Sequence, residues 1–348
     1  MKFVVATYGR KHAGMLLAHL HSIRSSHPQA GVEVYHQDIP SDLLEAIMKA
    51  HPEVKWTATQ FDFASDKILR ISSKTLAWDY AMHQQPQGET VCLLDVDTLV
   101  RKDLQPFFSE PDCDVIFTYK SGGFVLNTGV LLCRINPRTL AFFEAWRKET
   151  IAILHDPERF RQANDPKLPY GAADQMALNQ MIGYKEGETQ YERRLADQLV
   201  KLRAEPCELL NETRSCPLSE TKHILHYKGG WQPILLDGHR FSHHRPKAVS
   251  WEMYLFYLDT FRASLRRLNG ELKTDWQARD FHIQIPAYVE ERNPVRQRIS
   301  YFLFVLSDYM REAFERGCGR IRMLSQKLRH SPTIPSPASA AASTSASR

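Results

Sequence analysis

Two aspartates separated by one residue follow a strongly apolar segment, and this pair is the first feature of the sequence that could do chemistry. Residues Val91 to Leu94 run directly into Asp95 and Asp97. Alternate residues of a strand point the same way, so both carboxylates would project from one face or curl around the strand's end. Two carboxylates so close repel each other unless a cation lies between them. A divalent metal site is therefore favoured over a strand-terminal turn with exposed acids.

A histidine in the later segment "HYKGG" offers a third ligand for such a metal. His226 ends another apolar segment, and Gly229 and Gly230 follow it closely. Glycines let backbone N–H groups approach an anion. Carboxylate oxygens combined with one imidazole suit Mn²⁺ or Mg²⁺. Asp95, Asp97 and His226 are therefore predicted to hold a divalent metal that binds a diphosphate and acts as a Lewis acid for its departure.

The pattern around these acids predicts an open α/β sheet. Strands are expected at 2–9, 31–38, 54–63 and 91–100, with helices between them at 12–28, 41–52 and 72–85. This alternation implies a mostly parallel sheet with helices on its faces. Ligands bind such sheets at the carboxyl ends of the strands, where Tyr8 and the aspartate pair both fall. Later segments continue the pattern: strands at 114–120 and 125–135, helices at 137–156 and 170–183, and a strand leading into a Gly-rich loop within 222–234.

Length and composition bound the organisation of the chain. Its 348 residues carry a net charge of +5, which is too weak to argue for a nucleic-acid partner. No apolar run approaches the ~20 residues of a membrane-spanning helix, and the N-terminus does not resemble a signal peptide, so a cytoplasmic protein is expected. The predicted domains are an α/β domain over 1–245, a helical extension over 246–330 and a disordered Ser/Ala/Pro tail over 331–348.

Four motifs, in order, resemble those of the family 8 retaining glycosyltransferases, which include glycogenin and bacterial lipopolysaccharide galactosyltransferases. "SSKTLAWDYAM" ahead of "DVDTLV" resembles the lysine-bearing helix that precedes the family's DxD motif. "LNTGVLL" is similar to its FNxGV motif, "GAADQMALN" to its DQxxLN motif, and "HYKGGWQP" to its HFxGxxKPW motif. The resemblance covers residues 3 to about 234. It implies a GT-A fold, a Mn²⁺ or Mg²⁺ ion and a UDP-sugar donor.

The resemblance also implies roles for individual residues. It places Asp174 on hydroxyls of the donor sugar, Gln175 beneath the anomeric carbon and Asn127 on sugar hydroxyls, which both ends of its amide could contact. The remaining donor contacts fall at the strand ends and in the last motif: Ala6, Thr7, Tyr8, Lys74, Asp95, Val96, Lys228, Gly229 and Gln232. Tyr8 would stack on uracil. Because Gln175 is an amide and no carboxylate nucleophile is apparent beneath the sugar, front-face attack with retention of configuration is expected.

Residue type alone leaves a structural alternative for several of these positions. Tyr8 could be an ordinary loop aromatic, Lys74 a solvated helix lysine, and Asn127 a turn-forming asparagine. Asp174 opens a predicted helix, where an acid gains from the helix dipole and from capping. The functional and structural readings of these four residues stay open at the level of sequence.

One departure from the family pattern bears on catalysis. The family's last motif carries a lysine that grips the leaving diphosphate, and here that position is Gln232. Lys228, His239 or Arg240 would then have to supply the missing cation. The alternative function is a non-catalytic GT-A-fold protein that binds a nucleotide or glycan. A third reading, a haloacid-dehalogenase-type phosphatase with "DVDT" as its first motif, lacks the later acidic pair that such enzymes need.

The C-terminal region raises the question of the acceptor. Residues 292–330 carry nine Arg or Lys against three acids around the segment "ISYFLFVLSDYM". This region is either a helical cover for the sheet edge or an interfacial anchor on anionic lipid. An anchor suits a glycan or lipid-linked glycan acceptor, as in lipopolysaccharide or polysaccharide synthesis, with the protein peripheral to the inner face of a membrane.

Overall fold

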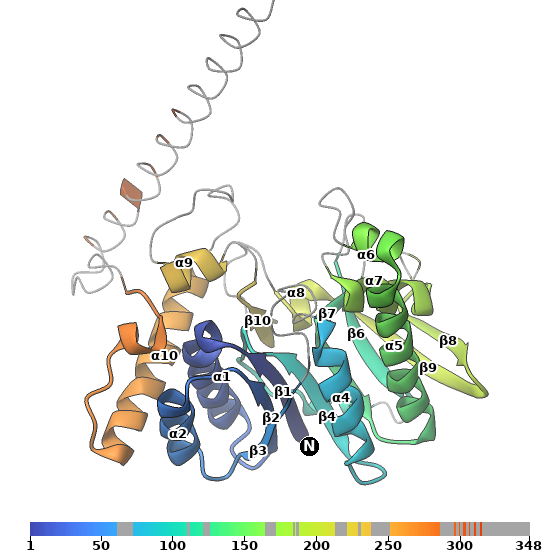
Figure 1. Ribbon diagram of the computed structural model, residues 1–348, viewed down its shortest axis with the longest axis horizontal. Coiled ribbons are helices and arrows are strands. Elements are labelled where there is room, and N and C mark those ends of the chain that lie inside the picture. Colours follow the sequence, from blue (N-terminus) through green and yellow to red (C-terminus); the bar gives the residue numbers. More distant parts are fainter. Residues whose placement is uncertain are drawn as a thin grey trace, which may run out of the picture. The chain divides into compact units, whose positions relative to one another are not determined.

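Apolar strands alternating with helices build the first half of the central sheet (Figure 1). In this computed structural model the strands are parallel in the spatial order β3–β2–β1–β4. Their bounds are Lys2–Tyr8 for β1, Gly31–Gln37 for β2, Lys55–Ala58 for β3 and Thr90–Asp95 for β4. The helices between them are α1 (Ala13–Ser26), α2 (Ser41–Ala50) and α4 (Lys74–His83). The predicted alternation is confirmed for this half.

The second half of the sheet mixes strand directions. β7 is antiparallel to β4 and to β6, β9 is parallel to β6, and β8 is antiparallel to β9. The bounds are β6 (Val115–Tyr119), β7 (Leu126–Arg134), β8 (Gln190–Leu195) and β9 (Gln198–Pro206). No strand was expected at 190–206. For β8 the reason is that "QYERRL" lies at the sheet edge and lacks an apolar face. The whole is the predicted α/β fold with a mostly parallel sheet flanked by helices.

Helices cover both faces of this sheet. The side chains of β1 alternate between the two faces. On one face, Val4, Ala6 and Tyr8 join an apolar cluster with residues of α4, α5 (Pro137–His155), α6 (Pro157–Ala163) and α7 (Ala173–Ile182). On the other face, Phe3 contacts His27, the residue that follows α1. The core therefore lies between sheet and helices, and the carboxyl ends of β1 and β4 remain available for a site.

Short elements complete the first compact unit, Met1–Ala287. β5 (Thr98–Val100) and β10 (Ile224–His226) form a separate two-stranded antiparallel sheet. α10 (Trp251–Leu272) packs against α1 and α2. The other elements are η1 (Arg10–His12), η2 (Gln105–Phe108), α8 (Cys207–Leu210), α9 (Trp231–Asp237) and η4 (Ala278–Phe281). The boundary expected at residue 245 lies in an undescribed segment, and the second compact unit is Tyr288–Arg348.

The structure describes residues 1–60, 72–109, 112–120, 126–163, 172–183, 185, 188–212, 221–228, 231–237 and 251–285, together with 296, 299, 302, 303, 306, 310 and 314. Within these residues, no helix has both the length and the apolar character needed to cross a bilayer. The predicted tail, 331–348, lies outside them.

Candidate metal and donor site

The strand that carries the aspartate pair ends at the first acid and turns into another sheet. β4 ends at Asp95 beside β1, and β5 begins at Thr98 in the two-stranded sheet. The Thr98 hydroxyl donates to the Asp95 carbonyl at 2.8 Å, and the Tyr227 N–H donates to the Asp97 carbonyl at 2.7 Å. His19 Nδ1 lies 2.5 Å from the Thr98 carbonyl oxygen. The two carboxylates therefore curl around the strand end, one of the two arrangements predicted.

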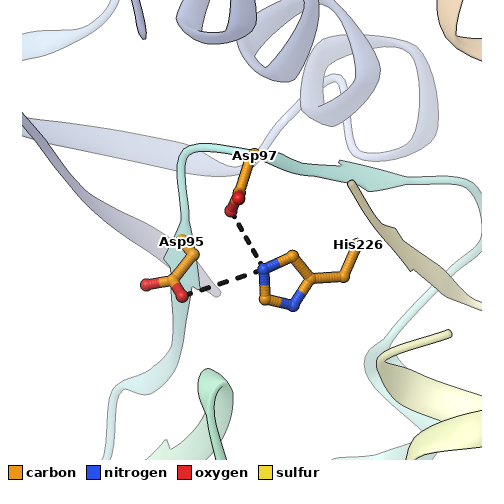
Figure 2. A group of neighbouring side chains, drawn as sticks. All are labelled: Asp95, Asp97 and His226. Atoms are coloured by element: carbon orange, nitrogen blue, oxygen red, sulfur yellow. Dashed lines mark ion pairs between the residues drawn. The ribbon is translucent and has the colours of Figure 1, made fainter. Parts of the chain in front are cut away.

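β10 brings the histidine to these acids. His226 pairs with Thr98 in the antiparallel register, so its side chain arises beside the turn. Its Nε2 lies 3.0 Å from Asp97 Oδ1 and 3.9 Å from Asp95 Oδ2 (Figure 2). The imidazole is 1% exposed. The three residues predicted as metal ligands therefore converge, although more than 120 residues separate the aspartates from the histidine in sequence.

The chemistry of this group matches a divalent cation. Each residue offers one ligand atom, and these atoms lie within 4.8 Å of one another. Ligand atoms about 2.1 Å from an octahedral ion are ~3.0 Å apart when adjacent and ~4.2 Å apart when opposite. The distances of His226 Nε2 from the two carboxylates, 3.0 Å and 3.9 Å, lie in this range. Burial opposes ionisation of Asp97, yet the charges of His226 and His12, when these rings are protonated, and the hydrogen bond from Gln232 hold its pKa below the usual value. Asp97 therefore stays a carboxylate, the form that ligates a metal.

Lys74 lies inside the site and is almost fully buried. Its Nζ donates to Asp95 Oδ1 at 2.8 Å and to Asp95 Oδ2 at 3.1 Å, and lies 3.4 Å from Asp174 Oδ2. Desolvation opposes its charge, but the two carboxylates raise its pKa. The solvated-lysine reading is therefore wrong, because the ammonium holds two acidic residues together.

Asp174 occupies the second position of α7 and does not cap that helix. The cap residue is Ala172, which has no side-chain cap bond. Asp174 Oδ2 accepts from the Thr128 hydroxyl at 2.8 Å, while Oδ1 is buried without a hydrogen-bond partner among the described residues. The neighbouring Gln175 is half-buried. A buried carboxylate oxygen without a donor is costly, so Oδ1 is suited to accept from a bound hydroxyl.

Asn127 is tied into the protein by one end of its amide. Its Oδ1 accepts from the Gly129 N–H at 2.8 Å and from Asn211 Nδ2 at 2.9 Å. The side chain thus makes the local turn-like bond of the structural reading, and it lies in β7 rather than in a turn. With Oδ1 occupied twice, contact with sugar hydroxyls through both ends of the amide is disfavoured, and the NH₂ end is the one left for a ligand.

The end of β1 presents mostly backbone to the site. Ala6 pairs with Asp95 in the sheet register, and Ala6, Thr7 and Tyr8 are all buried, as is Val96. Tyr8 is 9% exposed and belongs to the apolar cluster. Desolvation raises its pKa, the contact with Ser73 opposing and the charge of Asp95 adding to the shift. A ring so covered offers little surface for stacking on uracil, and that role stays a prediction.

The last motif differs most from its expected form. Gly229, His239 and Arg240 lie outside the described residues. The segment after the glycines is helical, because α9 begins at Trp231 instead of continuing the expected loop. Gln232 Nε2 donates to Asp97 Oδ2 at 2.9 Å, so this side chain contacts a metal ligand. Desolvation lowers the pKa of Lys228, although the charges of Asp95 and Asp97 partly oppose the shift.

Sequence reasoning missed several residues that shape this site. Asn211 contacts His226, Thr128 contacts Asp174, and Gly129 lies against the imidazole. Thr128 and Gly129 stand inside "LNTGVLL", so their neighbourhood was marked by the motif. Asn211 stands in "NET", which resembles only a glycosylation sequon, and no spacing links it to the histidine.

A comparison with protein-family models finds no match, and a comparison with curated proteins finds none either. Among solved structures, the chain is similar to galactosyltransferase LgtC in complex with donor and acceptor sugar analogues: 19% identity, TM-score 0.47, covering 76% of this chain and 96% of that one. It is similar to glycosyltransferase GlyE of Streptococcus pneumoniae TIGR4 at 15% identity and TM-score 0.49, covering 77% and 63%. Its similarity to mouse xyloside xylosyltransferase 1 in the apo form has 12% identity and a TM-score of 0.41, and covers 65% of this chain and 97% of that one. All three are glycosyltransferases, the class that the sequence motifs resemble, and at these identities and TM-scores the likeness assigns no activity to this chain.

Proposed function

We propose that the protein is a metal-dependent retaining glycosyltransferase that moves a hexose from a UDP-sugar to a hydroxyl of a glycan or lipid-linked glycan. The observation that carries this proposal is the convergence of Asp95, Asp97 and His226 at the carboxyl ends of β1 and β4. A divalent cation at such a sheet edge can bind a nucleotide diphosphate, and these donors suit Mn²⁺ or Mg²⁺. When bound, the cation supplies Lewis-acid stabilisation of the departing diphosphate.

The remaining residues of the site divide the work of binding the donor. Asp174 Oδ1 is a buried acceptor without a donor among the described residues, and a sugar hydroxyl would satisfy it. The NH₂ group of Asn127 is available for a second hydroxyl. The charges of Asp95 and Asp97 favour the charged form of Lys228, and no ion pair to Lys228 is found among the described residues. It is our candidate for the cation that Gln232 does not provide.

The proposed reaction retains the configuration of the sugar. The bond between the anomeric carbon and the β-phosphate oxygen breaks, and the acceptor oxygen bonds to that carbon from the same face. The proton of the acceptor hydroxyl passes to the departing phosphate oxygen. Gln175 would lie beneath the sugar, where its amide is a poor nucleophile. Detection of a glycosyl adduct on Asp174, the adjacent carboxylate, would contradict front-face attack.

Calorimetric titration of UDP tests the donor site. UDP should bind tightly in the presence of Mn²⁺ and far more weakly in EDTA, and Asp97→Asn should bind UDP weakly in both conditions. Asp259→Asn is the matched control, because this exposed α10 aspartate loses the same charge but pairs with Arg262 and not with a residue of the site. A screen of UDP-sugars for metal-dependent release of UDP then tests the reaction. Equal UDP affinity with Mn²⁺ and in EDTA, in both the wild type and Asp97→Asn, would refute the proposal.

One observation favours a second candidate function, a nucleotide- or glycan-binding protein without transfer activity. Gln232 replaces a cation and donates to Asp97. A site that lacks this cation gives less stabilisation to the charge of a leaving diphosphate. Metal-dependent UDP binding without release of UDP from any UDP-sugar, in the presence of glycan acceptors, would favour this candidate.

We further propose that the second unit contacts an anionic membrane surface. Its described large apolar residues are helical and exposed, between 44% and 72%, with the spacing of one helix face: Ile299, Phe302, Leu303, Leu306, Met310 and Phe314. The surrounding residues 292–330 are strongly basic in sequence, which complements anionic headgroups. A lipid-linked acceptor would meet the enzyme at such a surface.

Vesicle sedimentation tests the membrane proposal. The full chain should pellet with phosphatidylglycerol-containing vesicles and remain in solution with phosphatidylcholine alone. Replacing Phe302, Leu306 and Phe314 by glutamine should abolish pelleting, whereas Tyr80→Gln, at an equally exposed aromatic on α4, should leave it unchanged. Equal pelleting of the triple variant and the wild type would refute the anchor.

A further inference from the structure

The imidazole of His226 is held from behind by a buried asparagine. His226 Nδ1 lies 2.7 Å from Asn211 Oδ1, on the ring edge that faces away from the two aspartates. Asn211 follows α8 and is fully buried. Its Nδ2 donates to Asn127 Oδ1 at 2.9 Å and to Thr118 Oγ1 at 2.9 Å. The contacts link the two-stranded sheet that carries His226 to β6 and β7 of the central sheet.

The direction of each hydrogen bond in this chain follows from one backbone group. The Gly129 N–H can only donate, so the atom of Asn127 that it contacts at 2.8 Å is the oxygen. That oxygen also faces Asn211, so the facing atom of Asn211 is its NH₂ nitrogen. The other end of the Asn211 amide is then the oxygen, and it can only accept from His226 Nδ1. The neutral ring therefore carries its hydrogen on Nδ1.

This tautomer leaves the lone pair of Nε2 pointing at the metal position. Nε2 faces Asp97 Oδ1 at 3.0 Å and Asp95 Oδ2 at 3.9 Å. Three electron-rich atoms directed at one point repel each other and attract a cation. The opposite tautomer would put a hydrogen on Nε2, which would bond to Asp97 and block ligation. The state of Nδ1 thus decides whether the ring can be a ligand.

We propose that Asn211 is a positioning residue of the metal site, which together with Asn127 fixes the Nδ1–H tautomer of His226. We call the sequence Gly129 N–H, Asn127, Asn211 and His226 the tautomer relay. The proposal deepens the proposed function, because it assumes that His226 ligates a metal. It also gives the Asn127 oxygen a structural task within the site.

The tautomer itself can be measured without any metal. In ¹⁵N-histidine-labelled protein with EDTA at alkaline pH, long-range ¹H–¹⁵N spectra distinguish the two ring nitrogens, and His226→Gln identifies the signal. The wild type should show the hydrogen on Nδ1. Asn211→Leu removes the acceptor and should shift the ring toward the Nε2–H form. Thr118→Val, the matched control, removes the other partner of the same NH₂ group and should leave the tautomer unchanged.

Asn127→Leu provides an independent variant, in case Asn211→Leu does not fold. Without the Asn127 oxygen, the Thr118 hydroxyl is the one remaining partner of the Asn211 NH₂ group among the described residues, and a hydroxyl can donate or accept. The Asn211 amide is then free to turn over, and a mixture of tautomers is expected. A wild-type ring protonated on Nε2, or an Nδ1–H ring that persists in both leucine variants, would overturn the relay.

Mn²⁺ affinity, measured by calorimetry, connects the tautomer to the site. Asn211→Leu should weaken Mn²⁺ binding roughly 10- to 100-fold, the usual loss when a residue behind a metal ligand is changed, and Thr118→Val should have little effect. Unchanged affinity together with an unchanged tautomer would refute the relay. If the wild type binds no Mn²⁺ while Asn211→Leu still shifts the tautomer, the metal proposal is refuted and the relay stands.

Discussion

Alanine at position 129 should disable the metal site through its contacts with His226 and Asp95. Gly129 lies in β7, and a Cβ on it would be 2.4 Å from His226 Cε1, 2.8 Å from His226 Nδ1 and 2.9 Å from Asp95 Oδ2. Carbon atoms in contact are about 3.5–4.0 Å apart. The imidazole would therefore have to retreat by roughly 1 Å, and the Asp95 carboxylate by a smaller amount.

The ring has little room for this movement. His226 is 1% exposed and its Nδ1 is hydrogen-bonded to Asn211, so retreat breaks a buried polar contact or shifts β10. Overpacking of this kind costs about 1–3 kcal/mol of stability. Metal–ligand distances tolerate only about 0.2 Å, so a ligand displaced by ~1 Å no longer binds. Changes to residues that only contact a metal ligand weaken metal binding roughly 10- to 100-fold. The loss of Mn²⁺ affinity in Gly129→Ala should be at least as large, because the ligand itself is displaced.

The assay pairs calorimetric Mn²⁺ titration with urea unfolding of Gly129→Ala and Gly270→Ala. A Cβ at Gly270, inside α10, would meet nothing within 4 Å. That control should keep wild-type Mn²⁺ affinity and gain about 0.5–1 kcal/mol of stability. Wild-type affinity in Gly129→Ala would refute the assignment of His226 as a ligand, or the seating of its ring against the β7 backbone.

Three further outcomes are expected. Lys74→Met leaves the buried Asp174 carboxylate unpaired and should cost about 3–5 kcal/mol in urea unfolding, part of which Asp174→Asn should restore; a neutral effect would contradict the ion pair. Lys228→Gln should weaken UDP binding roughly 10- to 100-fold by calorimetry while Mn²⁺ affinity stays constant, and equal UDP affinity would remove Lys228 from the donor site. Burial lowers the pKa of His19 from 6.5 to about 4, so the native state resists protonation. Stability should be full above pH 6.5 and fall by roughly 3 kcal/mol as the pH drops toward 4, and His19→Leu should flatten this part of the pH–stability curve.

The metal ligands could be predicted from sequence because strand ends obey a simple rule. Asp95 ends β4, which is parallel to β1, and parallel strands deliver their carboxyl ends to one edge of a sheet. His226 also ends an apolar strand, but β10 lies in a separate antiparallel sheet and reaches the aspartates through its pairing with β5. The alternating strands and helices from β1 to β4 carry strong periodic signals for the same reason. The turn at Val96 and Asp97, between β4 and β5, places the two carboxylates around the end of the strand. This was one of the two arrangements of the aspartate pair that the sequence predicted.

Other parts of the site depend on contacts that no local pattern encodes. A lysine at the start of a helix is ordinarily solvated, and it is the packing of α4 on β1 and α5 that buries Lys74 against Asp95. Asn211 lies between two segments with weak periodicity, so its place behind His226 appears only once β10 pairs with β5. The role of Gln232 could not be predicted from its residue type, because the NH₂ group of an amide can donate a hydrogen bond to a phosphate or to a carboxylate.

The charges of the site explain why a metal and a diphosphate should bind together. Asp95, Asp97 and Asp174 supply three negative charges, while Lys74 and Lys228 supply at most two positive charges. With the histidines neutral, these charges repel a diphosphate when no cation is bound, and a divalent cation reverses the sign. UDP and Mn²⁺ should therefore bind with positive coupling, and each should strengthen the other by the same factor.

Position 232 tests this reading of the charges. Gln232→Lys places a cation beside Asp97, where the amide now donates at 2.9 Å. The added charge performs part of the metal's task, so UDP affinity in EDTA should rise and the coupling factor between UDP and Mn²⁺ should fall. Titration of UDP at a series of fixed Mn²⁺ concentrations gives that factor for both proteins. If it is the same in both, the charge at position 232 does not reach the diphosphate, and Gln232 acts only through Asp97.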